Sequence, residues 1–304
     1  MAMLSRVADS LFWMGRYLER AEQLARQLEV TRDMLVDLAE PDPDRAKAEW
    51  QATLVSLCVP NLALERLVFD ATNVGTLAGC VGQARENARQ VREVIANEMW
   101  ERINQAYWGL VEARDQEQSE GAISHILAET TAIAATWDGQ TDSSMHRGEA
   151  WIFLKLGKWL ERLERIGRTV IARLAQQESM QSTTQENVIS VVLLKSVGAL
   201  EAYRKLSPTR VERKSVLEFL LFQQKFPRSL QFCALESFEL VTQLSQICRD
   251  SDAAIGRSFG RLASRLEHGD IDEVLSAGPD AFLQDILAEM ARATNLLQRS
   301  YFLQ

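Results

Sequence analysis

The sequence GRYLERAEQLAR (Gly15–Arg26) occurs a second time as GKWLERLERIGR (Gly157–Arg168), 142 residues further along the chain. Six of the twelve positions are identical and three more are conservative. Apolar residues in both regions alternate at intervals of three and four, the spacing of a helix that packs along one stripe. This repeat predicts two equivalent long helices. The stripe comprises Leu11, Met14, Leu18, Ala21, Ala25 and Leu28 in the first copy, and Phe153, Leu156, Leu160, Leu163, Gly167 and Val170 in the second.

A second pair of similar segments follows the two copies in the same order. LERLVFDATNVGTLAGC (Leu64–Cys80) matches LEFLLFQQKFPRSLQFC (Leu217–Cys233) at six of seventeen positions. Two repeats in one order indicate a duplicated helical unit. We predict an N-terminal helical half, residues 1–140, and a C-terminal helical half, residues 141–304, that share one core. We also expect the two Glu-Arg motifs to meet around a pseudo-two-fold axis.

Proline is scarce, and none lies between Pro60 and Pro208. Because proline and glycine are the main helix breakers, this predicts an all-α bundle of about ten helices. Asp42 and Thr76 are expected to cap helices, and the polar stretch 138–144 is expected to link the halves. Helical pattern covers 4–39, segments that begin near 43, 61 and 76, a segment through 100 and 108, and 122–137, 145–178, 184–206, 209–223, 228–249, 252–268 and 280–302.

The composition of the chain excludes several classes of protein. The 304 residues include 34 Lys and Arg against 42 Asp and Glu, a net charge of −8, which argues against a general nucleic-acid binder. No apolar run reaches the roughly 20 residues that span a bilayer, and no signal peptide is evident. The four cysteines form no C-x-x-C pair, as expected of buried thiols in a reducing compartment. We therefore expect a cytoplasmic protein with no nucleic-acid or membrane partner.

The charged residues of the repeated motif lie off the apolar stripe, and two interpretations remain open. On a solvated face they would form only weak pairs, worth about 0.2–0.5 kcal/mol each. If other helices cover them, they must be fully paired. They would then fix how the halves join or line an anion-binding cavity, because guanidinium groups match carboxylates and phosphates. The residues are Arg16, Glu19, Arg20 and Glu22 in the first copy, and Lys158, Glu161, Arg162 and Glu164 in the second.

A second group of arginines lies between the two copies. Arg85, Arg89 and Arg92 have the i, i+4, i+7 spacing of one helix face. They would form either a docking spot for an anionic group or an amphipathic exterior with Glu93 as the counter-charge. Arg228 lies near the start of a later predicted helix.

The usual catalytic and metal-binding signatures are missing. The three histidines belong to no E-x-x-H or H-E-x-x-H motif, and there is no P-loop and no G-x-S-x-G elbow. Asp33-x-x-x-Asp37 and Asp138-x-x-x-Asp142 have the spacing of magnesium-diphosphate ligands, but the second pair falls in the predicted linker. We therefore predict no metal and no cofactor.

At GRYLERAEQLAR, ARENARQVRE, EMWERIN, GKWLERLE and FPRSLQFC the chain resembles the alpha-E domain family, bacterial all-α proteins, over essentially its whole length. The resemblance implies an association with circularly permuted ATP-grasp proteins and transglutaminase-like proteins. Such a setting implies a part in forming or processing an amide-linked peptide product. By position, the resemblance implies roles for Arg16, Glu19, Arg20, Glu22, Arg85, Glu86, Asn87, Arg89, Trp100, Glu101, Arg147, Glu161, Arg162 and Arg228.

Three positions depart from the family pattern. Lys158 stands where an arginine is usual, Leu163 where a small residue is usual, and Val74 where a proline is usual. A lysine holds an anion as a point charge and not as a bidentate fork. The two halves are therefore not expected to be fully equivalent.

Three functions are open on these grounds. The first is an accessory, non-catalytic component of an ATP-grasp-associated amide ligase system that binds its partner enzyme or a peptide through the Arg/Glu residues. The second is an enzyme that uses Glu19 or Glu161 as acid or base in an arginine-lined cavity. The third is a purely structural oligomer. A glutamate that faces a pocket without a cation would favour chemistry, and one locked to an arginine would favour structure.

Overall fold

A computed structural model describes residues 3–38, 41–59, 61–115, 120–178, 182–207, 211–248 and 252–303. The described residues contain fourteen helices and no strand, which confirms the predicted all-α class. None of these helices combines the length and the apolar character needed to cross a membrane. They are α1 (Ser5–Leu38), α2 (Pro43–Leu57), α3 (Leu64–Phe69), α4 (Leu77–Gln90), α5 (Asn97–Asp115), α6 (Glu120–Ser144), α7 (Glu149–Glu178), α8 (Thr183–Ser196), α9 (Leu200–Leu206), α10 (Arg213–Phe222), α11 (Leu230–Ile247), α12 (Ala253–Glu267), α13 (Ile271–Ala277) and α14 (Pro279–Tyr301).

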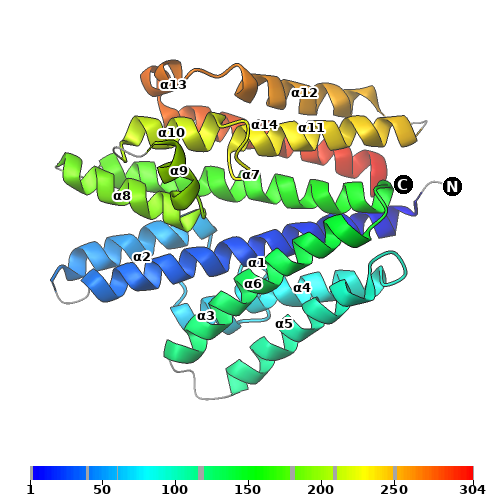
Figure 1. Cartoon of the computed structure of the whole chain (residues 1–304), viewed down its shortest axis with the longest axis horizontal. Helices are drawn as coiled ribbons and strands as arrows, with labels where there is room; N and C mark the ends of the chain where they lie inside the picture. Colours follow the sequence, from blue (N-terminus) through cyan, green and yellow to red (C-terminus); the bar gives the residue numbers. More distant parts are fainter. Residues whose placement is uncertain are drawn as a thin grey trace.

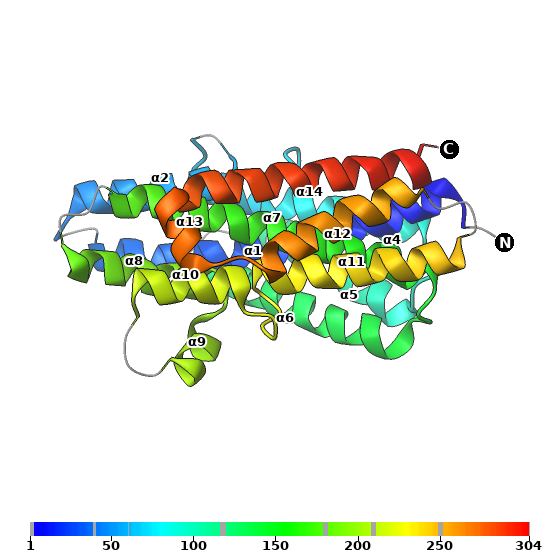
Figure 2. The same ribbon diagram turned by 90° about the horizontal axis from the view of Figure 1, so that it is seen from above.

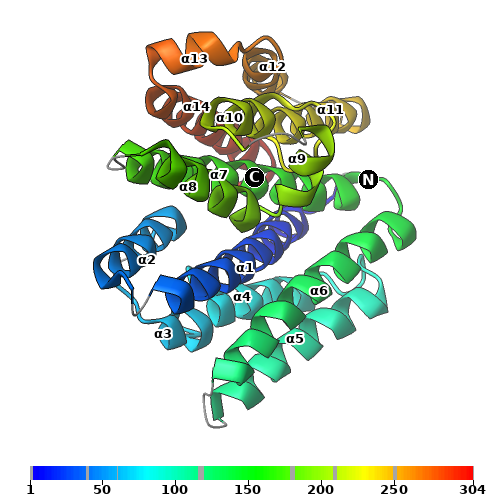
Figure 3. The same cartoon turned by 60° about the vertical axis from the view of Figure 1, so that its left-hand side comes forward.

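The two helices that carry the repeated motif, α1 and α7, run side by side through the middle of the molecule (Figure 1). Helices α4 and α6 pack on α1, whereas α11 and α14 pack on α7. Helices α2 and α8 each contact both central helices. Figure 3 shows the result from another side: α3 to α5 lie beyond α1, and α10 to α14 lie beyond α7. The same arrangement is therefore built twice around a central pair.

The second repeat also adopts one structure in both halves. Thr76 caps α4 with its hydroxyl, which accepts from the N–H of Gly79 and donates to the carbonyl of Asp70. Ser229 caps α11, and its hydroxyl donates to the carbonyl of Gln223, the residue equivalent to Asp70. The predicted caps at Thr76 and at Asp42, which accepts from a backbone N–H of α2, are thus confirmed.

The expected linker at 138–144 is wrong, because these residues form the last two turns of α6. Their polar side chains bond to α7: Lys158 Nζ lies 2.5 Å from Asp138 Oδ2, and Lys155 Nζ lies 2.9 Å from Asp142 Oδ1. The polar run therefore stabilises a helix through tertiary ion pairs, which the local sequence does not reveal. The chain turns instead just before Glu149, where α7 begins.

The number of helices exceeds the expected ten because some predicted helices are interrupted. The segment predicted as one helix over 184–206 is two, α8 and α9, since Gly198 lies between them with a left-handed φ of 67°. The strand-like stretch 188–194 is helical, as predicted. The short helix α13 fills the expected gap between 268 and 280. In Figure 2 it joins α12 to α14 at one end of the molecule.

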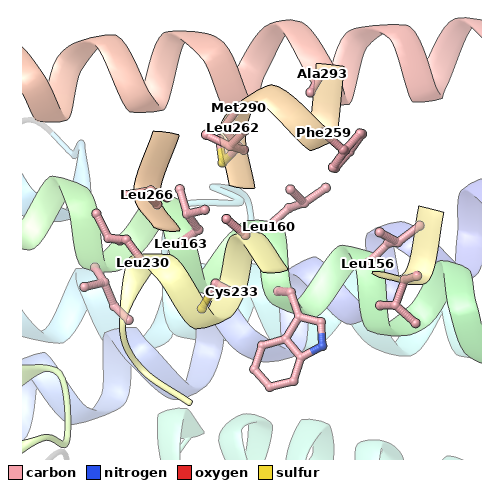
Figure 4. Close-up of a cluster of buried hydrophobic side chains, with 14 of the residues drawn as sticks. Leu156, Leu160, Leu163, Leu230, Cys233, Phe259, Leu262, Leu266, Met290 and Ala293 are labelled. Atoms are coloured by element: carbon pink, nitrogen blue, oxygen red, sulfur yellow. The ribbon is translucent and has the colours of Figure 1, made fainter. Parts of the chain in front are cut away.

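The largest hydrophobic cluster contains residues of both halves. It includes Phe12 and Met14 of α1 together with most of α7 and the helices that follow. Figure 4 shows its C-terminal part, where Leu160 and Leu163 of α7 face Leu262 of α12 and side chains of α11 and α14. A smaller cluster lies entirely within the N-terminal half, between α1, α2 and the helices α3 to α6.

Two equivalent glycines set the closest approach of the central helices. A Cβ atom on Gly15 would overlap the carbonyl oxygen of Leu154, and a Cβ atom on Gly157 would overlap the carbonyl oxygen of Phe12. Leu154 and Phe12 are themselves equivalent in the repeat. The contact is therefore reciprocal, as a two-fold relation between the helices requires. This bears out the predicted meeting of the two motifs.

Gly157→Ala is expected to lower the free energy of unfolding by about 1–3 kcal/mol, because the new methyl group meets backbone and the helices must separate. Urea unfolding followed by circular dichroism measures the change. The control is Gly139→Ala in α6, where a Cβ meets nothing within 4 Å and helix propensity favours alanine by up to about 1 kcal/mol. Equal stability of the two variants would contradict the role given to Gly157.

Candidate functional site

The Glu-Arg motifs of α1 and α7 bond to each other across the contact. Arg162 donates from Nε and Nη2 to both oxygens of Glu19, at 2.6 and 2.7 Å. In the equivalent interaction, Arg20 donates from Nε and Nη2 to both oxygens of Glu161, at 2.6 and 3.1 Å. The glutamate of each motif thus accepts two hydrogen bonds from the arginine of the other motif. This is the bidentate geometry that makes guanidinium–carboxylate pairs strong.

Glu161 is the most enclosed of these carboxylates. Its side chain is 0% exposed, and it also accepts from Arg16 Nε at 2.6 Å and Arg165 Nε at 2.8 Å. Burial alone would raise the pKa of Glu161, but the guanidinium groups of Arg16, Arg165 and Arg20 outweigh it and hold the pKa well below its ordinary value. Glu161 is therefore a charged structural group and not a proton donor at neutral pH.

The burial decides between the two interpretations of the motif. Five charged residues of the two motifs are less than 9% exposed: Arg16, Glu19, Glu22, Glu161 and Arg162. The interpretation as a solvated face is therefore wrong, and the structure shows a face covered by other helices. Both candidate acid/base glutamates are locked to arginines. By the criterion set from the sequence, this favours a structural role for their charges.

We call the buried network of ion pairs between α1 and α7 the lattice; it comprises Glu19, Glu161, Glu164, Arg16, Arg20, Arg162 and Arg165. Its two halves differ at two equivalent positions. Arg16 bridges Glu161 and Glu164, but its counterpart Lys158 turns away to Asp138 of α6. Likewise, the counterpart of Arg165 is neutral Gln23, which donates to Glu19 at 3.4 Å. The side of the lattice around Glu19 therefore has fewer direct cations than the side around Glu161.

Arg228, which belongs to neither α1 nor α7, brings a further cation to the side of the lattice around Glu19 and Glu22. It lies between α10 and α11, and its Nη2 donates to Glu22 at 2.6 Å, beside Arg26 Nη2 at the same distance. Burial alone would raise the pKa of Glu22, but Arg228, Arg162 and Arg26 lower it to about 2. Burial lowers the pKa of Arg228, although Glu22 opposes this effect. Arg228 thus joins the site across more than 200 residues of sequence.

A cavity of about 270 Å³ opens on this side of the lattice, between α1, α6 and α7. Five of its lining residues are cationic and three are carboxylates. Burial and the neighbouring Arg162 lower the pKa of Lys158 to about 8, against the opposing effect of Asp138. The cavity is lined by Gly15, Leu18, Glu19, Glu22, Arg26, Ala134, Ala135, Trp137, Asp138, Leu154, Lys155, Lys158, Arg162 and Arg228. We call it the α6 pocket.

A related cavity of about 240 Å³ lies on the opposite side of the central pair, against α14. Its residues Glu164 and Arg168 are the equivalents of Glu22 and Arg26 in the α6 pocket. Here Arg168 pairs with Glu164 at 2.8 Å, and Arg16 pairs with the same carboxylate at 2.5 Å. In this α14 pocket, as we call it, both lining arginines are thus bonded to the one lining carboxylate.

The second arginine cluster lies apart from the lattice, on α4 and α5. Arg85 bonds to Asn104 and lies over the ring of Tyr107 at 4.6 Å. Exposed Arg89 pairs with Glu86 of its own helix. Helix α4 ends at Gln90, and Arg92 lies beyond it, but Arg85 and Arg92 both lie over the ring of Trp100, at 5.5 and 5.0 Å. Asn87 is half-buried on α4, Glu101 is exposed on α5, and exposed Arg147 lies over Trp151 just before α7.

The described part of the chain assembles no group of metal ligands, and the expectation of buried cysteines holds for Cys80 and Cys233 but is wrong for Cys58, which is exposed. No cluster there has three or more His, Cys, Asp or Glu side chains that could hold a metal ion. Cys80 and Cys233, equivalent in the second repeat, are fully buried, and burial raises the pKa of each thiol to about 12. Neither is a reactive thiolate.

Four charged or aromatic residues of the α6 pocket were missed as site candidates from the sequence: Arg26, Trp137, Asp138 and Lys155. The signal that could have found Asp138 and Lys155 is the pair Lys155 and Lys158, three residues apart on one helix face, with Asp138 and Asp142 four residues apart on the preceding helix. Only the linker interpretation of residues 138–144 concealed it.

The fold and the lattice define an all-α protein with paired Glu-Arg motifs at its centre. The Alpha-E family, described as a predicted alpha-helical domain with a conserved ER motif, matches residues 3–302, and the chain belongs to this family. Uncharacterised proteins of Mycobacterium bovis and of Mycobacterium tuberculosis strain H37Rv are 27% and 26% identical to it over 255 residues. That stretch covers 75% of this chain but 28% of each relative, so the chain matches less than a third of their length. No solved structure matches the chain at a significant level.

Glu161→Gln is expected to lower the free energy of unfolding by about 3–5 kcal/mol, because three arginines would face a neutral amide in a buried site. Chemical unfolding at pH 7 measures the loss. The control is Glu86→Gln, which removes an exposed pair and is expected to change stability by less than about 0.5 kcal/mol. A loss from Glu161→Gln no larger than the control would contradict the lattice.

The lowered pKa values of Glu22 and Glu161 predict how stability depends on pH. Both groups bind protons more readily in the unfolded chain, so their contribution is complete above pH 4.5 and is lost as the pH falls. For Glu22 the loss extends from its ordinary value of 4.5 down to about 2. Urea unfolding at a series of pH values should show this slope, and Glu22→Gln should flatten it. An unchanged slope in that variant would contradict the assignment.

Proposed function

We propose that this chain is an accessory, non-catalytic binding component of an ATP-grasp-associated amide ligase system in the cytoplasm. It engages a partner protein or the peptide on which that system acts. The observation that carries the proposal is the state of the two candidate glutamates: each is bonded at both oxygens by arginine. Such bonding holds the two halves together and occupies most of the acceptor sites of both carboxylates, which favours a structural role for them.

The α6 pocket supports a binding role. It lies beside the lattice, so the same residues that fix the helices also fix the pocket wall, as binding sites require. Its surplus of cations suits an anionic group, in a chain whose overall charge is −8. Membership of the Alpha-E family and its resemblance-based link to ATP-grasp and transglutaminase-like proteins supply the setting.

The alternative of an enzyme finds less support from the same geometry. Glu161 lines neither the α6 pocket nor the α14 pocket, and Glu19, although it lines the α6 pocket, is held by Arg162. A general base needs a free lone pair within reach of its substrate. The third possibility, a structural oligomer, gives no reason for a cation-rich pocket.

The proposal is tested by co-purification and turnover. A tagged copy of the chain should retain an ATP-grasp protein of the same organism, and its addition should change the rate of amide formation by that protein. The purified chain alone should form no amide bond from peptide and ATP. Absence of both a complex and an effect on turnover would overturn the proposal, and amide formation by the chain alone would establish the enzyme instead.

A further inference from the structure

Three residues that line the α6 pocket carry a buried N–H group with no acceptor. They are Arg26 at Nε, Arg228 at Nη1 and Trp137 at Nε1, and none of these atoms has a hydrogen-bond partner in the described part of the chain. Within the same part of the chain, no lining residue has a buried oxygen that lacks a donor. A buried donor left unpaired costs about 1–3 kcal/mol. The pocket therefore suits a ligand whose polar groups only accept hydrogen bonds.

The charges of the pocket point to the same kind of ligand. Its five cations face three carboxylates, and Asp142, outside the lining, takes a further bond from Lys155. A surplus of one to two positive charges therefore remains around the cavity. Arg228 is central to it, since its Nη2 is held by Glu22 while its buried Nη1 has no acceptor in the described part of the chain.

The α14 pocket shows that these features are not a general result of the fold. It has equivalent residues, but none of them has an unpartnered buried polar side-chain atom in the described part of the chain. Arg16 there bonds to Glu161 and Glu164, and Arg168 bonds to Glu164. On the α14 side the arginines are bonded to carboxylates, whereas on the α6 side three buried donors have no acceptor in the described part of the chain.

The rest of the wall limits the size and character of the ligand. Leu18, Ala134, Ala135 and Leu154 give the cavity an apolar side. Its volume of about 270 Å³ is just under the usual range for drug-sized ligands, about 300–1,000 Å³. It therefore suits a small molecule or a chain end with one anionic group and a short apolar body.

We propose that the α6 pocket binds a carboxylate, the free end of a small acid or short peptide, through Arg228, Arg26 and Trp137. A carboxylate has two oxygens and one charge, which match few donors and a small cationic surplus. A phosphate would bring a second charge against Glu19, Glu22 and Asp138, which already line the cavity. Binding is a property of the chain alone, but identification of the acid as a peptide end rests on the proposed function.

The test uses the isolated full chain and N-acetyl-L-alanine as the probe. Isothermal titration should show saturable binding of this acid, and the neutral N-acetyl-L-alaninamide should not bind. Arg228→Gln should weaken binding at least tenfold, because the unpartnered guanidinium N–H is lost. Arg168→Gln, which removes an arginine bonded to Glu164 in the α14 pocket, should leave the affinity unchanged. Inorganic phosphate is titrated as the competing anion and should bind more weakly than the acid.

Each alternative outcome overturns the proposal. These outcomes are no saturable binding of the acid, equal binding of the amide, tighter binding of phosphate, or an equal loss in Arg168→Gln. If Arg228→Gln fails to fold, Trp137→Phe decides, since it removes one donor and keeps most of the ring: unchanged affinity would overturn the inference. Because no ligase is present, failure here is distinct from failure of the accessory role, which shows only in complex formation and turnover.

Discussion

The reciprocal contact between α1 and α7 determines most of the molecule. Two glycines let the backbones approach, and two Glu-Arg motifs bond across the space that remains. Charges buried in this way are costly unless each has its partner, so the helices tolerate very little change in register or distance. Helices α2 and α8 contact both members of the pair, and the remaining helices pack outward from it. The central pair thus provides the frame on which the α6 pocket is built.

The pocket owes its character to departures from that two-fold relation. Lys158 and Gln23 take the places of two arginines, and Arg228 enters from the loop before α11. Each change is small, and among the described residues the α6 pocket has buried donors without acceptors whereas the α14 pocket has none. This asymmetry, and not the lattice itself, underlies the binding that we propose for the α6 pocket.

Much of this could be predicted from the sequence because repetition and helical periodicity are local signals. The two copies of the motif predicted the central helices, their equivalence and their meeting, and the scarcity of proline predicted the all-α class. The end of α6 could not be predicted, because its polar residues become helical only through bonds to Lys155 and Lys158. The α6 pocket as a whole was not predicted, because Arg228, itself a candidate from the sequence, and Trp137 come from segments that only tertiary packing brings together.

The covalent joining of the halves has a further consequence. In a symmetric dimer of identical chains, every substitution appears at both equivalent sites. A lysine in place of Arg16 would then have weakened both sides of the lattice at once. In this single chain, position 158 carries the lysine while position 16 keeps the arginine. The side of the lattice around Glu161 therefore keeps the ion pairs of Arg16. The side around Glu19 can differ from it in sequence and in structure.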